Sequence, residues 1–310
     1  MSTRVYRSKA QFEQNLPTVL VAILAKQKAA CLPLYLDCID KLDYPKSKIT
    51  LWVRENDSTD DTRAILEAWL DQHRHEYAKV HADFTPIDPT VSTMGVHEWT
   101  CERFRLLGRL RQESLDATLK LGCDSYFVAD CDNFVRPHVL KRLVSLNRPL
   151  VAPMLRHVDY PANRYSNFFA AVDPNGYFAA DSKYDDILSR SNHLLWNGGS
   201  FGVITVPLIH CTYLVRADAI PKLHYLEQFQ RYEFVSFADS ARKAKIKMAV
   251  DNYRDNGVIA LDSEPADLRR QVDQARDIMR AENVCKNVGS NRHRRPPPSR
   301  KVRPPPTQAP

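Results

Sequence analysis

Glycine is scarce in this sequence, which has nine in 310 residues and a single adjacent pair at Gly198-Gly199. P-loops and dinucleotide-binding turns need several glycines at fixed spacings, because their backbones approach phosphate closely. Neither pattern is present, and the G-x-S-x-G elbow of α/β hydrolases is also missing. These absences weigh against P-loop kinases, dehydrogenases and α/β hydrolases.

Paired cysteine spacings and long apolar runs are lacking as well. The seven cysteines form no C-x-x-C motif, and an odd number argues against a disulfide framework and for a reducing compartment. The apolar run Val19–Ala25 is far shorter than a membrane span and is followed at once by Lys26. It is more typical of a buried strand than of a signal peptide. We therefore expect a cytoplasmic protein without structural zinc.

Excess positive charge is confined to the end of the chain. Seven of the 44 basic residues and none of the 37 acidic residues follow Cys285, so the first 285 residues carry no net charge. The Arg/Pro-rich composition of 286–310 predicts a disordered tail. We expect this tail to make at most weak contact with anionic membranes and no specific contact with nucleic acid.

The body alternates between patterns typical of strands and of helices. Strands are predicted at 18–25, 49–53, 80–84, 125–129 and 150–154, and helices at 33–43, 60–71, 101–120 and 137–147. This order predicts an α/β fold with a mostly parallel central sheet flanked by helices. The helix at 101–120 is expected to bury Phe104, Leu107, Leu110, Leu115 and Leu119, and to end at Gly122.

The second half is less regular. Short strands are predicted near 167–172, 176–179, 203–206 and 211–215, and helices at 216–223, 235–245 and 265–284. We divide the chain into an N-terminal extension (1–16), one main domain (17–262), a C-terminal helix (263–285) and the basic tail (286–310). The segment Trp196–Ser200 combines an aromatic residue with two glycines, and is typical either of a sugar-stacking loop or of a surface turn.

Asp130-Cys131-Asp132 directly follows a predicted buried strand. Ligands of open α/β sheets bind outside the carboxyl ends of the strands. Two neighbouring carboxylates there repel each other unless a cation lies between them, and Mg²⁺ or Mn²⁺ prefers such oxygen ligands. The pattern by itself fits a metal site that binds a diphosphate and a solvated turn about equally well.

A second acidic group, Glu55-Asn56-Asp57 with Asp60-Asp61, follows the strand at 49–53. Acids at this point of a nucleotide-binding sheet accept hydrogen bonds from ribose or base. They also suit the N-terminus of the helix that follows, and Asp60 in particular is well explained as a cap. Both interpretations stay open at this point.

Several longer segments resemble the glycosyltransferase domain of collagen β-galactosyltransferases, in glycosyltransferase family 25. The similarity covers about residues 17–262, in order and with similar spacing. The most specific segments are Val151-Ala-Pro-Met-Leu155, Tyr165-Ser-Asn-Phe168 and Val206-Pro-Leu-Ile-His-Cys-Thr-Tyr213. The others are Thr18–Ala25, Leu51-Trp-Val53, Asp60–Thr62, Arg103–Gln112 and Asp130-x-Asp-Asn133.

The resemblance implies a GT-A-type fold, a UDP-sugar donor and Mn²⁺ or Mg²⁺. It implies Asp130 and Asp132 as metal ligands, with His210 as the third. It places Trp52 and Asn56 beside the nucleotide, although Trp52 also suits the core. We count Glu55, Asp57 and Asn133 with them as cofactor-binding candidates.

One departure from the family concerns the acidic pair before the late helix, where this chain has Tyr232-Glu233. In an inverting transfer, a carboxylate deprotonates the acceptor hydroxyl while the metal holds the departing UDP. Glu233 is the candidate base, with Asp239 as its rival, although Glu233 would also cap the helix.

We therefore predict an inverting hexosyltransferase that uses UDP-galactose or UDP-glucose and a glycan, lipid-linked or protein acceptor. A catalytically silent relative that binds partners is the main alternative, since one acid of the pair is missing. A nucleic-acid-binding role for the tail and a metal-dependent nucleotidyltransferase are weaker alternatives. The first predicts steep salt dependence, and the second leaves His210 unexplained.

Overall fold

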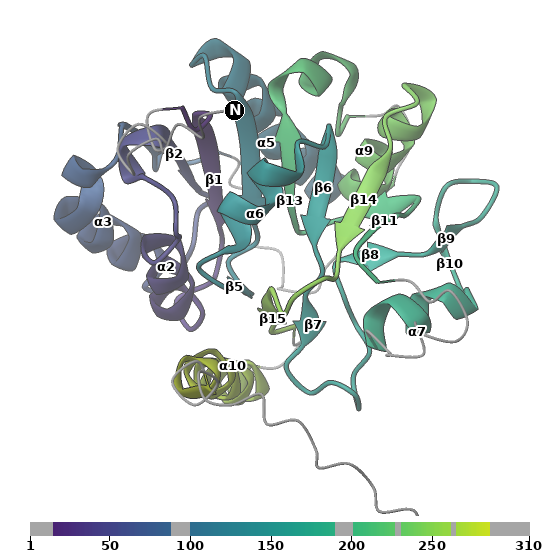
Figure 1. The fold of residues 1–310 in the computed structure, drawn as a ribbon. Helices are drawn as coiled ribbons and strands as arrows, with labels where there is room; N and C mark the ends of the chain where they lie inside the picture. The colour runs from purple at the N-terminus through teal and green to yellow at the C-terminus, as the bar shows by residue number, and fades with distance from the viewer. Residues whose placement is uncertain (1–14, 88–99, 190–200, 227–230, 262–264, 286–310) are drawn as a thin grey trace, which may run out of the picture.

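A computed structural model describes residues 15–87, 100–189, 201–226, 231–261 and 265–285 (Figure 1). The Trp196–Ser200 segment, most of the N-terminal extension and the basic tail lie outside these residues. Within them, no helix combines the length and apolarity needed to cross a membrane.

An eight-stranded sheet forms the centre of the molecule, with strand order β11-β14-β6-β13-β4-β1-β2-β3. The pairs β1–β2, β1–β4, β2–β3 and β6–β14 are parallel, whereas β13 runs antiparallel to both of its neighbours and β11 antiparallel to β14. The predicted α/β class with a mostly parallel sheet is confirmed. The strands are β1 (Val19–Ala25), β2 (Ile49–Glu55), β3 (Lys79–Asp83), β4 (Ser125–Ala129), β6 (Leu150–Pro153), β11 (Val203–Thr205), β13 (Thr212–Arg216) and β14 (Met248–Asp251).

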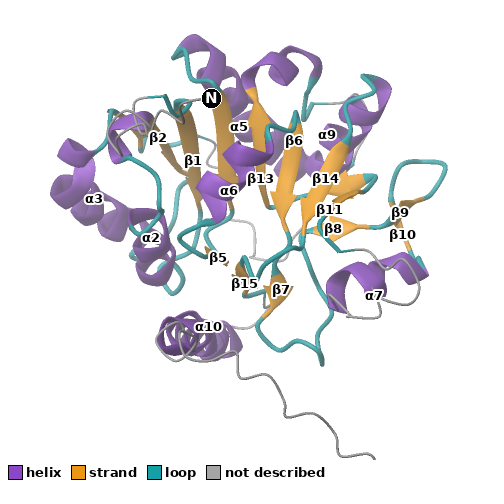
Figure 2. Ribbon diagram, in the orientation of Figure 1, coloured by secondary structure: helices purple, strands orange, loops and turns teal. Residues whose placement is uncertain are grey.

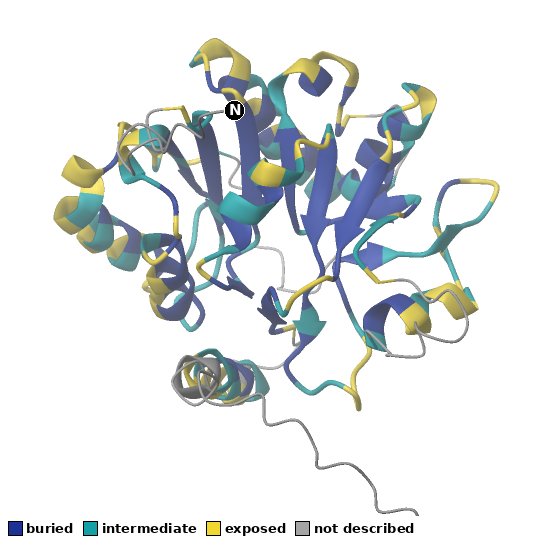
Figure 3. Ribbon diagram, in the orientation of Figure 1, coloured by how far each residue is buried: buried dark blue, intermediate teal, exposed yellow. Residues whose placement is uncertain are grey.

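Helices cover both faces of this sheet (Figure 2). The side chains of β1 alternate between the two faces of the sheet. Val19 and Val21 belong to the core that α2, α3, α6 and α10 cover, whereas Leu20 and Ala22 belong to the core that α5 and α9 cover. The inner strands β1 and β4 are accordingly buried over almost their whole length (Figure 3). The α-helices are α2 (Leu32–Asp40), α3 (Thr62–His73), α5 (Cys101–Lys120), α6 (Val139–Leu146), α7 (Ser182–Ser189), α9 (Glu233–Lys243) and α10 (Pro265–Cys285). Short 3₁₀ helices are η1 (Lys46–Lys48), η2 (Arg74–Glu76) and η3 (Ala217–Lys222).

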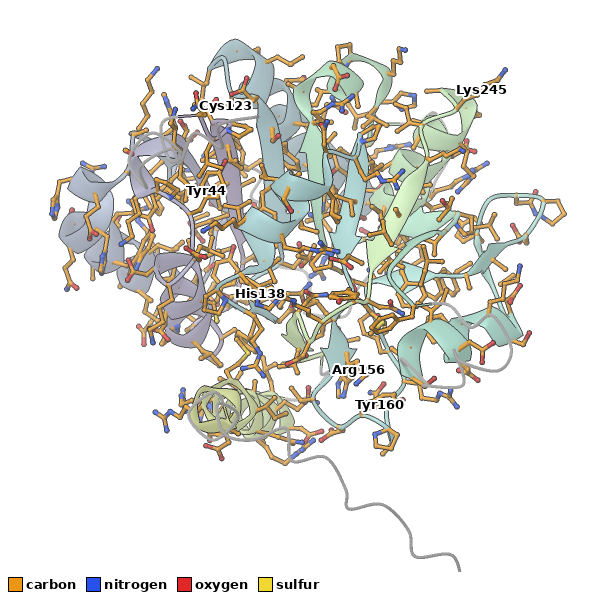
Figure 4. The ribbon with its side chains drawn as sticks, in the orientation of Figure 1. Tyr44, Cys123, His138, Arg156, Tyr160 and Lys245 are labelled. Carbon is orange, nitrogen blue, oxygen red and sulfur yellow. The ribbon has the colours of Figure 1, made fainter. Side chains whose placement is uncertain are left out.

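Three small sheets lie beyond the carboxyl edge or beside it. In the first, β15 (Gly257–Ile259) lies between β5 (Asn133–Val135) and β7 (Arg156–His157) and pairs with both. The other two pair β8 (Phe168–Phe169) with β12 (Leu208–Ile209) and β9 (Ala171–Val172) with β10 (Phe178–Ala179). In β7, the Arg156 guanidinium lies 4.7 Å from the Tyr160 ring centroid, and both residues are labelled in Figure 4. The sequence analysis did not predict β5, β7, β12, β14 or β15, because strands of two to four residues are too short to show a period. It also did not predict the helix α7.

The end of α5 bears out one detail of the prediction and corrects another. Gly122 has φ +69°, its N–H bonds to the Leu119 carbonyl at 3.1 Å, and the Cys123 N–H bonds to the Thr118 carbonyl at 2.9 Å. This is the left-handed cap that glycine was expected to supply. Leu119 itself is 42% exposed, so its predicted burial is wrong: it lies in the last turn, beyond the part of α5 that the core covers.

The predicted helix at 216–223 is a 3₁₀ helix, and Pro221 lies inside it. Proline has no backbone N–H and disfavours the α conformation in the residue before it, which explains the shorter, tighter form. The C-terminal helix α10 packs Val272 and Ala275 onto the same core as α2 and α6.

Gly257 offers a test of this packing. It has φ +126°, and a Cβ there would lie 2.0 Å from the Phe134 carbonyl oxygen. We expect Gly257→Ala to lower the free energy of unfolding by roughly 3 kcal/mol or more, since both the backbone and its neighbour must move. Gly122→Ala, where φ is +69° but the space is open, should cost about 1 kcal/mol. Equal losses in urea unfolding of the two variants would contradict this account.

Candidate active site

The candidate site lies at the carboxyl ends of β1, β2 and β4, where the sequence analysis expected it. The Asp130–Asn133 segment turns sharply after β4, with the Asn133 N–H donating to the Asp130 carbonyl at 2.8 Å. Because β13 pairs antiparallel with β4, Thr212 lies opposite Ala129 and the residues before it lie beside Asp130. The Asp130 N–H donates to the Cys211 carbonyl at 3.2 Å. Sheet pairing thus brings His210 and the Asp-x-Asp motif to one edge.

Asp130 is paired with an arginine from α5. Arg111 Nη2 lies 2.8 Å and 3.0 Å from the two carboxylate oxygens of Asp130. Arg111 Nε lies 3.4 Å from Glu233 Oε1, and both of these side chains are almost buried. Arg111 Nη1 is buried and has no hydrogen-bond partner. The Arg111 guanidinium therefore contacts both Asp130, the predicted metal ligand, and Glu233, the predicted base. Its Nη1 is not used by either contact.

Asp132 is paired with a lysine from the segment after β1. Lys28 Nζ lies 2.5 Å from Asp132 Oδ2, and the two side chains are 29% and 14% exposed. Asp132 opposes the loss of solvent around Lys28, so that the pKa of this lysine lies above its ordinary value. Lys28 is positively charged at every physiological pH.

His210 is buried and neutral. Burial lowers the pKa of its imidazole to about 4. Its Nε2 is buried without a hydrogen-bond partner, while Nδ1 lies 2.8 Å from Cys211 Sγ. The rings of Phe169 and Phe234 pack against it, with centroids 5.4 Å and 5.1 Å away. An unpartnered nitrogen of a neutral imidazole is the form that binds a divalent metal.

The turn that carries His210 is strained. Cys211 has φ +62°, and the Thr212 N–H donates to the His210 carbonyl at 2.6 Å, across a single residue. Such γ-turns with positive φ are rare for residues other than glycine. Strain of this kind persists only where the surroundings impose it, and it gathers at functional sites.

The three predicted ligands do not form a closed metal cage. Among the described residues, Asp40, His73 and Glu76 are the one group of three whose ligating atoms lie within 4.8 Å of one another. That group already holds a cation, because Lys46 Nζ pairs with both of its carboxylates. Asp130, Asp132 and His210 offer the right donors for Mn²⁺ or Mg²⁺, two carboxylates and a free imidazole nitrogen, but the carboxylates are drawn to Arg111 and Lys28.

The acids after β2 serve their own loop. Glu55 is buried and its Oε1 accepts from the Ser58 N–H at 2.5 Å. Asn56 is buried beside it. Asp57 has φ +50°, and its Oδ2 accepts from the Ile87 N–H at 3.0 Å. These hydrogen bonds fix the conformation of the turn. A nucleotide that bonds the carboxylates of Glu55 and Asp57 would have to share them with these N–H groups or displace the N–H groups.

Asp60 bonds the first N–H group of α3 without holding the N-cap position. Its Oδ1 accepts from the N–H of Thr62, the first residue of α3, at 3.1 Å, although Asp61 holds the N-cap position. Its Oδ2 accepts from the Ala29 N–H at 3.0 Å. Asp60 thereby joins α3 to the segment after β1 that carries Lys28.

Two further cofactor-binding candidates lie deeper. Asn133 is fully buried, donates from Nδ2 to Thr212 Oγ1 at 2.7 Å, and has an Oδ1 without a partner. It joins β5 to β13 behind the Asp-x-Asp turn. Trp52 is half-buried on β2 and packs against the core under α5 and α9, so its position suits both of the interpretations given to it.

The two base candidates lie apart on α9. Glu233 is the first residue of α9 and contacts Arg111, whereas Asp239 lies six residues further along. Lys243 Nζ and Arg242 Nη2 lie 2.6 Å and 3.2 Å from the Asp239 carboxylate. Within the described residues, no hydrogen bond or ion pair joins Asp239 to Arg111 or Asp130.

The sequence analysis missed Arg111 and Lys28 as site residues, and it did not single out the aromatic side chains around His210. Arg111 lies inside the Arg103–Gln112 segment that carried the family resemblance, and this was the available signal. The aromatic rings come from Tyr165, Phe169 and Phe234, and Tyr232 stacks on Phe234 with centroids 5.3 Å apart.

The fold and the site define an α/β protein with an acidic, cation-paired ligand site at the edge of its sheet. Comparison with known proteins identifies its family. Residues 16–279 match the model of the glycosyltransferase family 25 N-terminal domain. The chain belongs to glycosyltransferase family 25.

Its relatives include proteins named as galactosyltransferases and proteins named as inactive. Procollagen galactosyltransferase 2 of Homo sapiens is 32% identical over 260 residues, which cover 80% of this chain and 39% of that protein. Inactive glycosyltransferase 25 family member 3 of Mus musculus is 31% identical over 257 residues, covering 79% and 41%. The chain thus spans about two fifths of the length of the curated relatives it matches.

Solved structures are more distant. A mannosyltransferase of Pyrobaculum calidifontis, in complex with GDP-Man and Mn²⁺, is similar at 12% identity with a TM-score of 0.49, covering 90% of this chain and 77% of that one. This likeness is too remote to carry a conclusion about the site.

Proposed function

We propose that this protein is a metal-dependent, inverting glycosyltransferase that transfers galactose or glucose from a UDP-sugar to an acceptor hydroxyl. The observation that carries the proposal is one connected constellation: His210 with a free buried Nε2, and the Asp130–Arg111–Glu233 ion-pair chain beside it. Family membership supports the reaction class. The inactive relatives make a catalytically silent binding protein the competing function.

Asp130, Asp132 and His210 would hold Mn²⁺ or Mg²⁺. Bound there, the ion would neutralise the diphosphate of the departing UDP. Glu233 is the base that takes the proton from the acceptor hydroxyl, and its burial suits this role. Burial raises the pKa of its carboxyl, while Arg111 opposes the rise, which brings a glutamate toward the pH at which a base works well.

The acceptor class is a glycan, a lipid-linked sugar or a protein. A cytoplasmic location belongs to the same proposal, on the odd number of cysteines. Loop residues around β2, with Trp52, Asn56 and Asp57, are proposed to face the nucleotide, and Asn133 to support the metal turn from behind.

Release of UDP from a panel of UDP-sugars, with and without Mn²⁺, tests the proposal. We expect slow hydrolysis of one donor, UDP-galactose or UDP-glucose, that chelation abolishes. Metal-dependent binding of UDP without turnover of any donor, with a panel of sugar acceptors present, would favour the silent relative. Failure to bind UDP at all by calorimetry would refute the glycosyltransferase proposal.

A further inference from the structure

Each carboxylate of the Asp-x-Asp motif has a cation of the protein as its partner. The Arg111 guanidinium covers both oxygens of Asp130, and Lys28 Nζ bonds Oδ2 of Asp132. Arg111 is 11% exposed and Lys28 29%, so water screens these pairs less than ordinary surface pairs. The two positive charges offset the two carboxylates of the motif before any ligand binds, and Glu233 lies beside Arg111 as a third carboxyl group.

This arrangement has a consequence for metal binding. A divalent cation would bind the same two carboxylates that Arg111 and Lys28 already contact, and it would lie close to both positive charges. A metal ion alone raises the charge of the site by two, whereas a metal ion together with the diphosphate of a UDP-sugar leaves it unchanged. Repulsion in a partly buried site therefore opposes the first event and not the second.

Both cationic side chains are able to contact another acceptor. Arg111 has a second partner in Glu233. Its Nη1 is buried without a hydrogen-bond partner and is therefore available to donate to an acceptor. Lys28 carries a flexible side chain and follows β1 at the edge where ligands bind. Phosphate oxygens are the acceptors that both side chains favour.

We propose that Arg111 and Lys28 are resident counter-cations that hold a free divalent metal off Asp130 and Asp132, and that transfer to the diphosphate when metal and nucleotide bind together. The inference rests on the proposed function and adds a regulation of its site: metal and nucleotide bind cooperatively, because the donor releases the carboxylates for the metal. Reciprocity requires that metal tighten the nucleotide by the same factor.

Calorimetric titration of Mn²⁺, with and without saturating UDP, tests the proposal on the intact chain. In the wild type we expect UDP to tighten Mn²⁺ binding by tenfold or more. Arg111→Met and Lys28→Met should bind Mn²⁺ alone about tenfold more tightly than the wild type, and the effect of UDP should shrink in both. Arg111→Lys keeps the positive charge but does not contact both oxygens of Asp130 as a guanidinium does. Its affinity for Mn²⁺ alone should therefore lie between that of the wild type and that of Arg111→Met.

Lys141→Met is the matched control, because Lys141 pairs with Asp43 at 3.0 Å in an exposed position and should leave Mn²⁺ binding unchanged. Circular dichroism establishes that each variant is folded. If Arg111→Met does not fold, Arg111→Lys replaces it in the comparison with the wild type. If the wild type binds both ligands but the variants bind Mn²⁺ alone no more tightly, the counter-cation proposal is wrong and the proposed function stands. If the wild type binds neither ligand, both fail.

Discussion

Asp132→Ala is expected to lower metal-dependent UDP release about 10³-fold or more. The variant removes one of two carboxylates available to the metal and leaves Lys28, paired with it at 2.5 Å, without its counter-charge. Loss of about 4 kcal/mol of charge stabilisation at the leaving diphosphate corresponds to a thousandfold in rate. The measurement is initial UDP release under saturating Mn²⁺ and donor.

Asp43→Ala controls for the loss of an ion pair as such. It removes the partner of Lys141 in another lysine–aspartate pair, one that is well exposed and lies in a different region. We expect its rate to stay within about twofold of the wild type, since exposed pairs contribute little. A comparable loss in the two variants, or a near-normal rate in Asp132→Ala, would remove Asp132 from the metal site.

Glu233→Gln is expected to lower kcat by about 10²- to 10⁴-fold in the presence of acceptor, while Mn²⁺ and UDP still bind. Glutamine keeps the shape of the side chain beside Arg111 but does not accept a proton. Removal of a positioned general base has an effect of this size. The slow acceptor-independent release of UDP should change much less, because water does not depend on this base to the same degree.

Asp239→Asn decides between the two base candidates. Its carboxylate is paired with Lys243 and Arg242 on the same helix, so we expect a small effect on kcat. A larger loss in Asp239→Asn than in Glu233→Gln would transfer the role to Asp239.

The pH dependence follows from the environment of Glu233. Burial raises the pKa of its carboxyl above the ordinary glutamate value of 4.5, and Arg111 lowers it in part. A base acts in its ionised form, so kcat/KM, which reports groups of the free enzyme, should fall as the pH drops through this raised pKa and the carboxyl is protonated. In Arg111→Met the midpoint of this acid limb should move to higher pH, whereas a limb that stays in place would show that Glu233 is not the group that titrates.

Prediction from the sequence succeeded where the signal was local. The unbroken apolar run Val19–Ala25 indicated a strand covered on both faces, and each side of β1 is indeed buried in a different core. Gly122 ends α5 with positive φ, because few other residues adopt that conformation cheaply. Asp60 accepts from the Thr62 N–H at the start of α3, although Asp61 holds the N-cap position.

Prediction failed where the outcome depended on packing against elements that are distant in the sequence. Leu119 keeps the apolar spacing of α5 but extends past the surface that α5 covers, and it is exposed. β14 lies between β6 and β11 in the sheet, yet its four residues carry too short a pattern to be recognised alone. The inward position of Asn133, which donates to Thr212, also depends on the packing of β13, and its role in cofactor binding stays a prediction.

The sequence by itself determined the order of strands and helices, the position of Asp130 and Asp132 after a buried strand, and the family to which the chain belongs. Only the tertiary structure decided which charges meet there. Antiparallel insertion of β13 beside β4 brings His210 to Asp130, and the packing of α5 and the β1 loop brings Arg111 to Asp130 and Lys28 to Asp132 across 19 and 104 residues. Periodicity and capping act over a few residues, whereas ion pairs form between whichever charged groups the completed sheet and its helices bring together.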